Sequence, residues 1–359
     1  PVAENKLAWV LLRKIGTKVA NFIPSFDYEE YLRIVDEERL GFGHPEKGLI
    51  DADAMGIAMC VREEVKDESG KVVSHQDEWL HDKAEVLPLM EFAQHPNMQV
   101  LHYGSALFEG CTAEFDEAGN VCIFDLKGHY DRLNEGARSL DLPPLPSFEF
   151  FKDAVMRVVI ANRRFIPPYG KGRLYIRPNL VDVGPRLKVK SSHLVALNIT
   201  ASPIGNAKSY FGSVRKEVVM AVPRTHVRSV VGGIGGIKAG ANYARTILAI
   251  RLSESLGLPV VGYLDHVLKN GDTGATAEFR ETNASNLFAL EDLGEGRWKF
   301  ITPPLDRRDI LGGRTRALLL KVAEELGWEV EEGPLSLEDV RNKKYKYMGA
   351  CGTAAYITP

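Results

Sequence analysis

The sequence predicts an α+β protein of two domains, on the evidence of its length, the irregular order of its elements and a run of chain breakers. A chain of 359 residues suggests about two domains. Strand-like runs and helical periods follow one another without the regular alternation of a parallel α/β fold. Residues 201–213 hold Pro, Gly, Asn and Ser with no clear period. We therefore expect a first domain over 1–204, a linker over 205–213 and a second domain over 214–359.

Short apolar or alternating runs separated by turn residues predict the strands of the first domain. They lie at 55–61, from Val100 onward, at 121–124, at 174–177 and at 194–197, with turns at 64–71 and 117–120. Helical periods predict helices over 129–139 and 148–164, the second with Ala154, Val155, Val158 and Val159 on its buried face. Residues 7–20 fit a short amphipathic helix.

The second domain is predicted to mix strands and helices in the same way. Strand patterns lie at 218–222, 260–264 and 286–290, and a helix follows a glycine-rich turn over 242–256. Another helix is predicted over 315–326, with Leu318, Leu319, Val322 and Leu326 facing inward. Gly327 is placed to end it, because glycine readily adopts the left-handed backbone that closes helices.

Composition and charge argue against several classes of function. A net charge of -3 offers no general attraction for nucleic acid or an anionic membrane. The four cysteines form no CxxC pair and the nine histidines no HxxH or HExxH spacing, so we expect reduced thiols, a cytoplasmic location and no metal site. The apolar run at 7–12 is too short to span a bilayer and is followed at once by Arg13 and Lys14, so we expect no membrane anchor.

Lys238 is the residue most suggestive of chemistry. Four glycines lie among the six residues before it, and Gly240 follows it. Glycine is used where the backbone turns tightly or approaches a ligand closely, and lysine forms Schiff bases with carbonyl cofactors once its pKa is lowered. For an isolated lysine, a solvated position after a glycine-rich loop is the more common explanation. The interpretation therefore depends on partners elsewhere in the chain.

Three further positions fit the binding of a charged cofactor. Tyr243 lies five residues after the lysine, near enough to meet the same ligand. The glycines of the segment Leu311-Gly-Gly-Arg-Thr315 precede the predicted 315–326 helix, whose first N–H groups and dipole favour an anion. Glu281 comes before a hydrophobic strand, and it is either a solvated carboxylate or an acceptor for a protonated ring nitrogen.

Two arginines and a turn of small residues supply further candidate anion ligands. Arg132 lies on the predicted 129–139 helix, and Arg177 in the strand-like run Tyr175-Ile-Arg177. An arginine in such a position is more often simply solvated. Residues 350–355 form a small-residue turn in which Thr353 offers a hydroxyl. Each of these signals is weak by itself.

Together these segments resemble the branched-chain aminotransferase group of the fold type IV pyridoxal-phosphate enzymes. The similarity runs from about Met98 to Pro359 and rests on the order and number of the matching segments. These are 101–110, 129–133, 174–178, 232–243, 281–286, 301–304, 310–316 and 349–359. The resemblance implies a two-domain α+β fold, an aminotransferase reaction on amino acids and 2-oxo acids, pyridoxal 5′-phosphate as cofactor, and a homodimer.

The resemblance also implies a role for each candidate residue. Lys238 would bond to the cofactor and then move a proton between the substrate Cα and the cofactor carbon C4′. Tyr243 would hydrogen-bond the cofactor's phenolate oxygen, and Glu281 its ring nitrogen. The phosphate ligands would be Arg132, the backbone N–H groups of Arg314 and Thr315, and Thr353. The substrate α-carboxylate would meet Thr353 and Ala354. Its side chain would meet a pocket of Tyr103, Phe108, Tyr175 and Arg177, where the arginine would admit the distal carboxylate of glutamate.

The sequence departs from this group where the resemblance places the substrate. The stretch 266–280 is longer and more polar than usual, and Thr282-Asn-Ala-Ser285 replaces the usual residues after the glutamate. Arg314 stands where an apolar residue is usual. These changes question leucine, isoleucine and valine as substrates, but not the cofactor.

Other functions therefore stay open at this point. One is an aminodeoxychorismate lyase-like enzyme, and another is a D-amino-acid or amine transaminase. A binding or scaffold protein on a decayed enzyme fold is disfavoured, because drift would be expected to damage at least one member of the set Lys238, Tyr243, Glu281 and Arg132.

Overall fold

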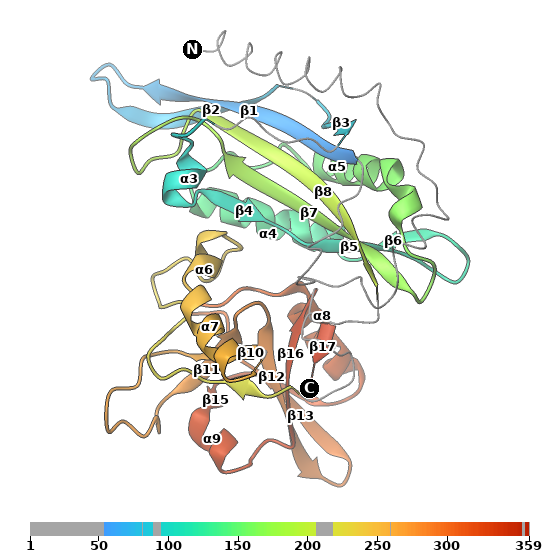
Figure 1. The fold of residues 1–359 in the computed structure, drawn as a ribbon, viewed down its shortest axis with the longest axis vertical. Coiled ribbons are helices and arrows are strands. Elements are labelled where there is room, and N and C mark those ends of the chain that lie inside the picture. Colours follow the sequence, from blue (N-terminus) through green and yellow to red (C-terminus); the bar gives the residue numbers. More distant parts are fainter. Residues whose placement is uncertain are drawn as a thin grey trace. The chain divides into compact units, whose positions relative to one another are not determined.

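The computed structural model of the chain describes residues 54–80, 82–88, 95–205, 218–258, 260–353 and 356–358. The chain divides into two compact units, Pro1–Ala207 and Lys208–Pro359, each with its own sheet (Figure 1). Residues 201–205, in the run of breakers, belong to the end of a strand. The rest of the expected linker and the expected helix over 7–20 lie outside the described residues, so both stay predictions.

The first unit is built on an eight-stranded antiparallel sheet in the order β2-β1-β8-β7-β5-β6, with β3 paired to β1 and β4 paired to β7. Its strands are β1 Ala54–Lys66, β2 Val72–Trp79, β3 Glu85–Pro88, β4 Ala106–Phe108, β5 Cys111–Phe115, β6 Val121–Ile123, β7 Gly172–Asp182 and β8 Leu194–Gly205. The helices among its described residues are α3 Gln99–Tyr103, α4 Leu126–Ser139, α5 Phe148–Ala161 and the 3-10 turn η1 Arg163–Phe165.

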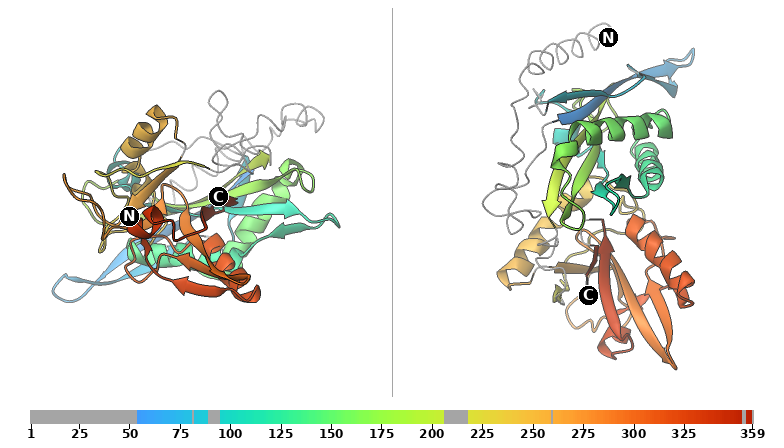
Figure 2. Two further views of the ribbon diagram at one scale, coloured as in Figure 1. Left: turned by 90° about the horizontal axis from the view of Figure 1, so that it is seen from below. Right: turned by 90° about the vertical axis from the view of Figure 1, so that its right-hand side faces the viewer.

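Helices α4 and α5 cover one face of this sheet (Figure 2). The predicted apolar stripe of α5 is confirmed, since Ala154, Val155, Val158 and Val159 are buried. On the sheet side, Leu107 lies against Gly136 of α4 and pairs across strands with Leu180. Because successive residues of a strand point to opposite faces, alternate residues of β7 lie on the face opposite α4 and α5.

The predicted strand beginning at Val100 is wrong, because this segment is the short helix α3. Gly104 ends the helix in a left-handed conformation, with a φ of 66°, and its N–H donates to the Val100 carbonyl at 3.1 Å. The Gln99 side chain donates to the Lys188 carbonyl in the β7–β8 loop at 2.6 Å. A contact from a distant part of the chain thus favours a turn of helix where the local pattern indicates a strand.

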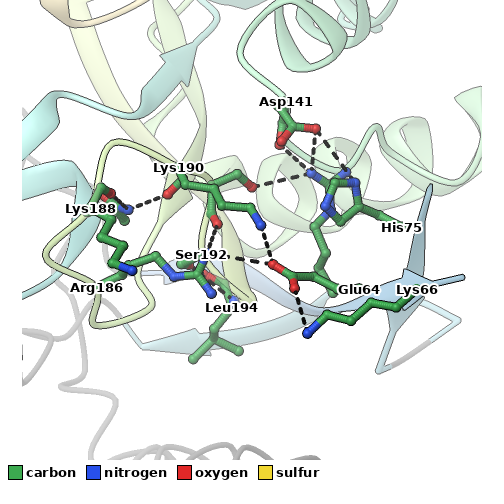
Figure 3. A network of polar contacts seen from close by, with 12 residues as sticks. Glu64, Lys66, His75, Asp141, Arg186, Lys188, Lys190, Ser192 and Leu194 are labelled. Carbon is green, nitrogen blue, oxygen red and sulfur yellow. Dashed lines mark hydrogen bonds and ion pairs between the residues drawn. The ribbon is translucent and has the colours of Figure 1, made fainter. Parts of the chain in front are cut away.

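A buried arginine joins three separate segments of the first unit. Arg62 of β1 forms a bidentate ion pair with Asp77 of β2, in which Nε donates to Oδ1 at 2.7 Å and Nη2 to Oδ2 at 3.1 Å. It also pairs at 3.1 Å with Asp141, which follows α4. Beside it, Glu64 binds Lys190 of the β7–β8 loop (Figure 3). The network thus joins the β1–β2 hairpin to the α4–α5 connection and to the β7–β8 loop.

We expect Arg62→Met to lower the free energy of unfolding by about 2 kcal/mol, because hydrogen bonds to charged groups contribute about 1.5–3 kcal/mol. Urea denaturation measures this change. Arg157→Met is the matched control, since Arg157 pairs with Asp153 on the surface of α5 at 2.8 Å, a type of pair worth about 0.5 kcal/mol. Equal effects of the two substitutions would contradict the central role of Arg62.

The second unit has a nine-stranded mixed sheet in the order β14-β13-β12-β11-β10-β9, with β15 on β11, β16 on β12 and β17 on β16. Its strands are β9 Met220–Ala221, β10 Val260–Leu264, β11 Glu278–Thr282, β12 Asn286–Gly294, β13 Arg297–Thr302, β14 Glu329–Glu332, β15 Leu335–Ser336, β16 Tyr347–Gly352 and β17 Tyr356–Thr358. Its helices are α6 Ala241–Ala244, α7 Ile247–Ser255, α8 Arg314–Glu325 and α9 Leu337–Arg341. Over the described ranges, no helix is both long and apolar enough to cross a membrane.

Two helix predictions in this unit need correction. The helix expected over 242–256 is split into α6 and α7, because Thr246 turns its hydroxyl back to the Tyr243 carbonyl at 2.7 Å. Helix α8 lies where it was predicted, and Gly327 closes it with a φ of 74°. Its inward face is different, as Leu326 is 58% exposed whereas Arg316 is buried. Arg316 donates to the Pro303 carbonyl and pairs with Glu332, both at 2.8 Å, and these bonds set the rotation of the helix.

Candidate active site

The glycine-rich turn before Lys238 packs directly onto another stretch of backbone. A Cβ atom on Gly235 would lie 2.1 Å from the Asp309 carbonyl oxygen, and one on Gly236 would lie 2.9 Å from the Arg308 carbonyl oxygen. No side chain larger than hydrogen fits at the first position. These two glycines are therefore required by a backbone contact inside the second unit.

Asp309 is itself held in place by a buried ion pair. Its carboxylate accepts two hydrogen bonds from Arg280 of β11, at 2.8 and 2.6 Å. Both side chains are almost wholly buried. A pair in this geometry is both directional and strong, so it fixes the segment on which the glycine-rich turn rests relative to β11.

Lys238 and Tyr243 are brought together as the sequence predicts. The Lys238 Nζ donates to the Tyr243 hydroxyl at 3.1 Å. Burial raises the pKa of Tyr243, but the charges of Lys238 and Arg228 and the hydrogen bond from Lys238 outweigh it, so the pKa lies below its ordinary value. The side-chain amide of Asn242 bonds back to the glycine-rich turn before Lys238, by donating to the Ile234 and Ile237 carbonyls.

Glu281, on the buried strand β11, is paired with an arginine that the sequence analysis did not single out. The Arg228 Nη1 donates to Glu281 Oε1, and both residues are 3% exposed. The guanidinium carbon of Arg228 also lies 5.5 Å from the centre of the Tyr243 ring. Burial raises the pKa of Glu281 to about 7, while Arg228 acts in the opposite direction. Lys238, Tyr243, Arg228 and Glu281 thus form one cluster.

The segment before α8 joins the same cluster. The Leu311 N–H points to Glu281 Oε2 at 3.5 Å, and the Leu311 carbonyl accepts from Asn286 at 2.8 Å. A Cβ atom on Gly313 would lie 1.9 Å from the Asn286 side-chain oxygen. Arg314 and Thr315 occupy the first turn of α8, the end of a helix at which the dipole favours an anion.

The polar residues after Glu281 form a compact turn. The Thr282 hydroxyl accepts from the Ser285 N–H at 2.9 Å and lies 2.6 Å from the Ser285 hydroxyl. These hydroxyls are therefore used in the β11–β12 connection. Thr353 lies in the turn that follows β16, while Ala354 lies outside the described residues.

In the first unit, three of the four residues expected in a side-chain pocket meet on the face of the sheet opposite α4 and α5. The Arg177 Nη2 donates to the Tyr175 hydroxyl at 2.9 Å, and its guanidinium carbon lies 4.5 Å from the centre of the Phe108 ring. Gly110 leaves room for this arrangement, since its Cβ would lie 2.0 Å from the Tyr175 hydroxyl. Tyr103 ends α3 with 41% of its surface exposed and contacts the ring of His102.

Arg132, also in the first unit, is held by a buried carboxylate. Its Nε and Nη2 each donate to Glu109 at 2.7 Å, and Nδ1 of His129 lies 2.6 Å from the same carboxylate. Burial disfavours the charge on Glu109, but Arg132 and His129 hold its pKa well below its usual range. The arginine is thereby kept in one orientation.

Arg228, Glu109 and His129 were not predicted as site residues from the sequence. Each leaves only a faint signal in the chain. Arg228 stands ten residues before Lys238, Glu109 lies in Phe-Glu-Gly110, and His129 is three residues before Arg132. Pairing between distant segments gives these residues their significance, and a single sequence does not reveal such pairing.

We expect Gly235→Ala to lower the free energy of unfolding by about 1–3 kcal/mol, because the new methyl group overlaps the Asp309 carbonyl. Gly240→Ala is the control, since a Cβ there meets nothing within 4 Å and its φ of -56° suits alanine. Urea denaturation of both variants tests the prediction. A loss of stability in Gly240→Ala as large as in Gly235→Ala would contradict it.

Comparison with known proteins identifies relatives for most of the chain. The family model of class IV amino-transferases matches residues 106–359. Branched-chain-amino-acid aminotransferase 2 (chloroplastic) of Arabidopsis thaliana is 30% identical over 325 residues, covering 90% of this chain and 74% of that protein. The branched-chain-amino-acid aminotransferase of Mycolicibacterium smegmatis is 32% identical over 288 residues, covering 79% and 74% of the two chains.

Solved structures agree with these relatives. The branched-chain amino acid aminotransferase of Escherichia coli matches with a TM-score of 0.63 and 26% identity, covering 77% of this chain and 83% of that one. The T.th. branched-chain amino acid aminotransferase with pyridoxamine 5′-phosphate matches with a TM-score of 0.60 and 25% identity, covering 76% and 82%.

Proposed function

The chain belongs to the class IV aminotransferase family and, within it, to the branched-chain aminotransferases, and on that premise we propose that it moves the amino group of a branched-chain or related aliphatic amino acid to 2-oxoglutarate. The predicted α+β fold of type IV and the predicted transaminase class are confirmed by the same likenesses. The observation that carries the proposal is the cluster of Lys238, Tyr243, Arg228 and Glu281, in which the arginine and the glutamate are buried.

The residues of the second unit fit pyridoxal 5′-phosphate as the cofactor. The cluster offers one amine, one phenol of lowered pKa and one buried carboxyl group. Each carboxylate oxygen can accept two hydrogen bonds, so Glu281 retains capacity for a ring N–H beside Arg228. The start of α8 supplies the donors that a phosphate requires. When bound, the cofactor supplies a carbonyl carbon for amines and a ring that takes up the electron pair released at the substrate Cα.

The chain's own groups have distinct tasks in this proposal. Lys238 would hold the cofactor, and its Nζ would accept the proton of the substrate Cα. Tyr243 would donate to the cofactor's phenolic oxygen, and Glu281 would accept from its ring nitrogen. Arg314 and Thr315 hold the phosphate through their backbone N–H groups, with Thr353 and Arg132 as further ligands. The phosphate lies away from the reacting carbon. Binding energy at the phosphate would therefore fix the position of the ring without contacts at that carbon.

Substrate recognition is proposed to rest on the cluster of Phe108, Tyr175 and Arg177, together with Tyr103. Two aromatic rings beside one guanidinium offer both an apolar surface and a positive charge. An aliphatic side chain would pack on the rings, and the distal carboxylate of glutamate would pair with Arg177. Thr353 and Ala354 are proposed to meet the α-carboxylate.

The alternatives are less well supported. The relatives reported above bear the names of branched-chain aminotransferases, not of lyases or D-amino-acid transaminases. The Thr282–Ser285 departure is accounted for by the hydrogen bonds of a turn. We also propose a homodimer in the cytoplasm, which size-exclusion chromatography with light scattering and cell fractionation would test.

We expect Lys238→Ala to abolish the visible absorbance band of the protein with bound cofactor and to lower transamination by at least about a thousandfold, because one amine both holds the cofactor and moves the proton. Absorbance spectra and single-turnover assays with leucine measure the two effects. A colourless wild-type protein without affinity for pyridoxal phosphate would overturn the proposed function.

We expect Arg177→Met to raise the KM for glutamate about 10- to 100-fold, the loss expected for a charged hydrogen bond. The KM for leucine should change by no more than about threefold, since its side chain carries no charge. Steady-state assays with each donor make the comparison. Equal losses for the two donors would remove the proposed role of Arg177.

A further inference from the structure

We propose that Arg228 is a positioning residue that keeps the Glu281 carboxylate charged and aligned while it sets the positive field at the Tyr243 hydroxyl. The inference rests on the proposed function, because it assigns Arg228 a role toward the cofactor that Glu281 and Tyr243 would hold. It concerns contacts within the second unit alone.

The geometry places one guanidinium between two groups of the cluster. Arg228 lies on the connection between β9 and the glycine-rich turn. Its Nη1 bonds Glu281 Oε1, and its guanidinium carbon is 5.5 Å from the centre of the Tyr243 ring. Its Nε is buried and has no hydrogen-bond partner among the described residues. A planar, permanently charged group can make both contacts at once, whereas a lysine ammonium ion is a single point of charge.

The charge balance explains why such a group is needed. Among the described residues, the charged groups with the largest influence on Glu281 are Arg228, Lys238 and Asp309, and Asp309 is already paired with Arg280. In the proposed reaction Lys238 bonds to the cofactor and then exchanges protons, so its charge varies. Of the groups that act on the buried carboxylate, Arg228 is then the cation whose charge stays constant. Without a cation, a buried carboxyl group takes up a proton and becomes neutral.

The titration behaviour of the neighbouring groups supports this role. Burial raises the pKa of Glu281 to about 7, and Arg228 is the largest influence in the opposite direction. Burial also raises the pKa of Tyr243, but Lys238 and Arg228 bring it below its ordinary value, against the negative charge of Glu281. Tyr263 faces Arg228 as well, and burial raises its pKa to about 12. Removal of Arg228 should move the Glu281 and Tyr243 titrations upward, since each loses a nearby positive charge.

The test compares the wild-type protein with Arg228→Met, Arg228→Lys and the control Arg251→Met, which alters an exposed arginine on α7. The first readout is an NMR titration of protein that has been freed of cofactor and carries a carbon isotope label at tyrosine Cζ. The variant Tyr243→Phe assigns the signal of Tyr243. We expect the pH midpoint of Tyr243 to rise by at least about one unit in Arg228→Met, and to stay near the wild-type value in Arg251→Met. An unchanged midpoint in Arg228→Met would overturn the inference.

The second readout uses the holoenzyme. Arg228→Met should shift the pH midpoint of the cofactor's absorbance band upward and weaken pyridoxal phosphate binding about tenfold or more, with Arg228→Lys between it and the wild type. Glu281→Gln should weaken binding similarly, and the double variant should lose less than the product of the two single losses, because both act through one pair. Independent losses that multiply would overturn the inference.

The design separates this inference from the proposed function. Wild-type protein that does not bind pyridoxal phosphate rejects the function, whereas wild-type binding with a normal Arg228→Met profile rejects only the role of Arg228. If Arg228→Met does not fold, the neutral double variant Arg228→Met/Glu281→Gln should fold, because no unpaired charge is then buried. Failure of the double variant to recover the fold would also count against the pairing.

Discussion

The second unit is organised around the buried carboxylate of Glu281, whose negative charge has to be balanced by cations and hydrogen-bond donors. Glu281 lies on β11 with almost no access to water, and a charge in such a position is costly unless other groups pair with it. Arg228 and the Leu311 N–H approach it from two separate connections of the chain. Both connections are therefore held against β11 by their hydrogen bonds to Glu281.

The neighbouring ion pair extends the same principle along β11. Arg280 precedes Glu281 and bonds Asp309 from two nitrogens, which anchors the backbone on which Gly235 rests. Lys238 follows this contact by three residues. The position of the amine is thus set by a chain of short contacts from a rigid strand, the kind of support that a reactive group needs to be held within a fraction of an ångström.

The first unit uses a similar arrangement to orient a cation. Glu109 is buried against α4 and bonds Arg132 through both of its oxygens, with His129 as a third partner. On the face of the sheet opposite α4 and α5, Tyr175 and Phe108 hold Arg177 through a hydrogen bond and a ring contact. In both cases a long, flexible side chain is restricted before any ligand arrives, which lowers the entropy cost of binding.

The sequence by itself was enough to identify the fold class, most strands and helices, and the amine, phenol and carboxyl group of the candidate site. These features have local signatures: glycines around Lys238, a short spacing to Tyr243, and a strand pattern next to Glu281. Only the tertiary structure revealed the roles of Arg228 and Glu109. The contacts of Arg316 also set the rotation of α8, and the segment that contains Val100 forms the helix α3. Local pattern depends on neighbours within a few residues, whereas these outcomes depend on charges and carbonyls that folding brings from distant parts of the chain.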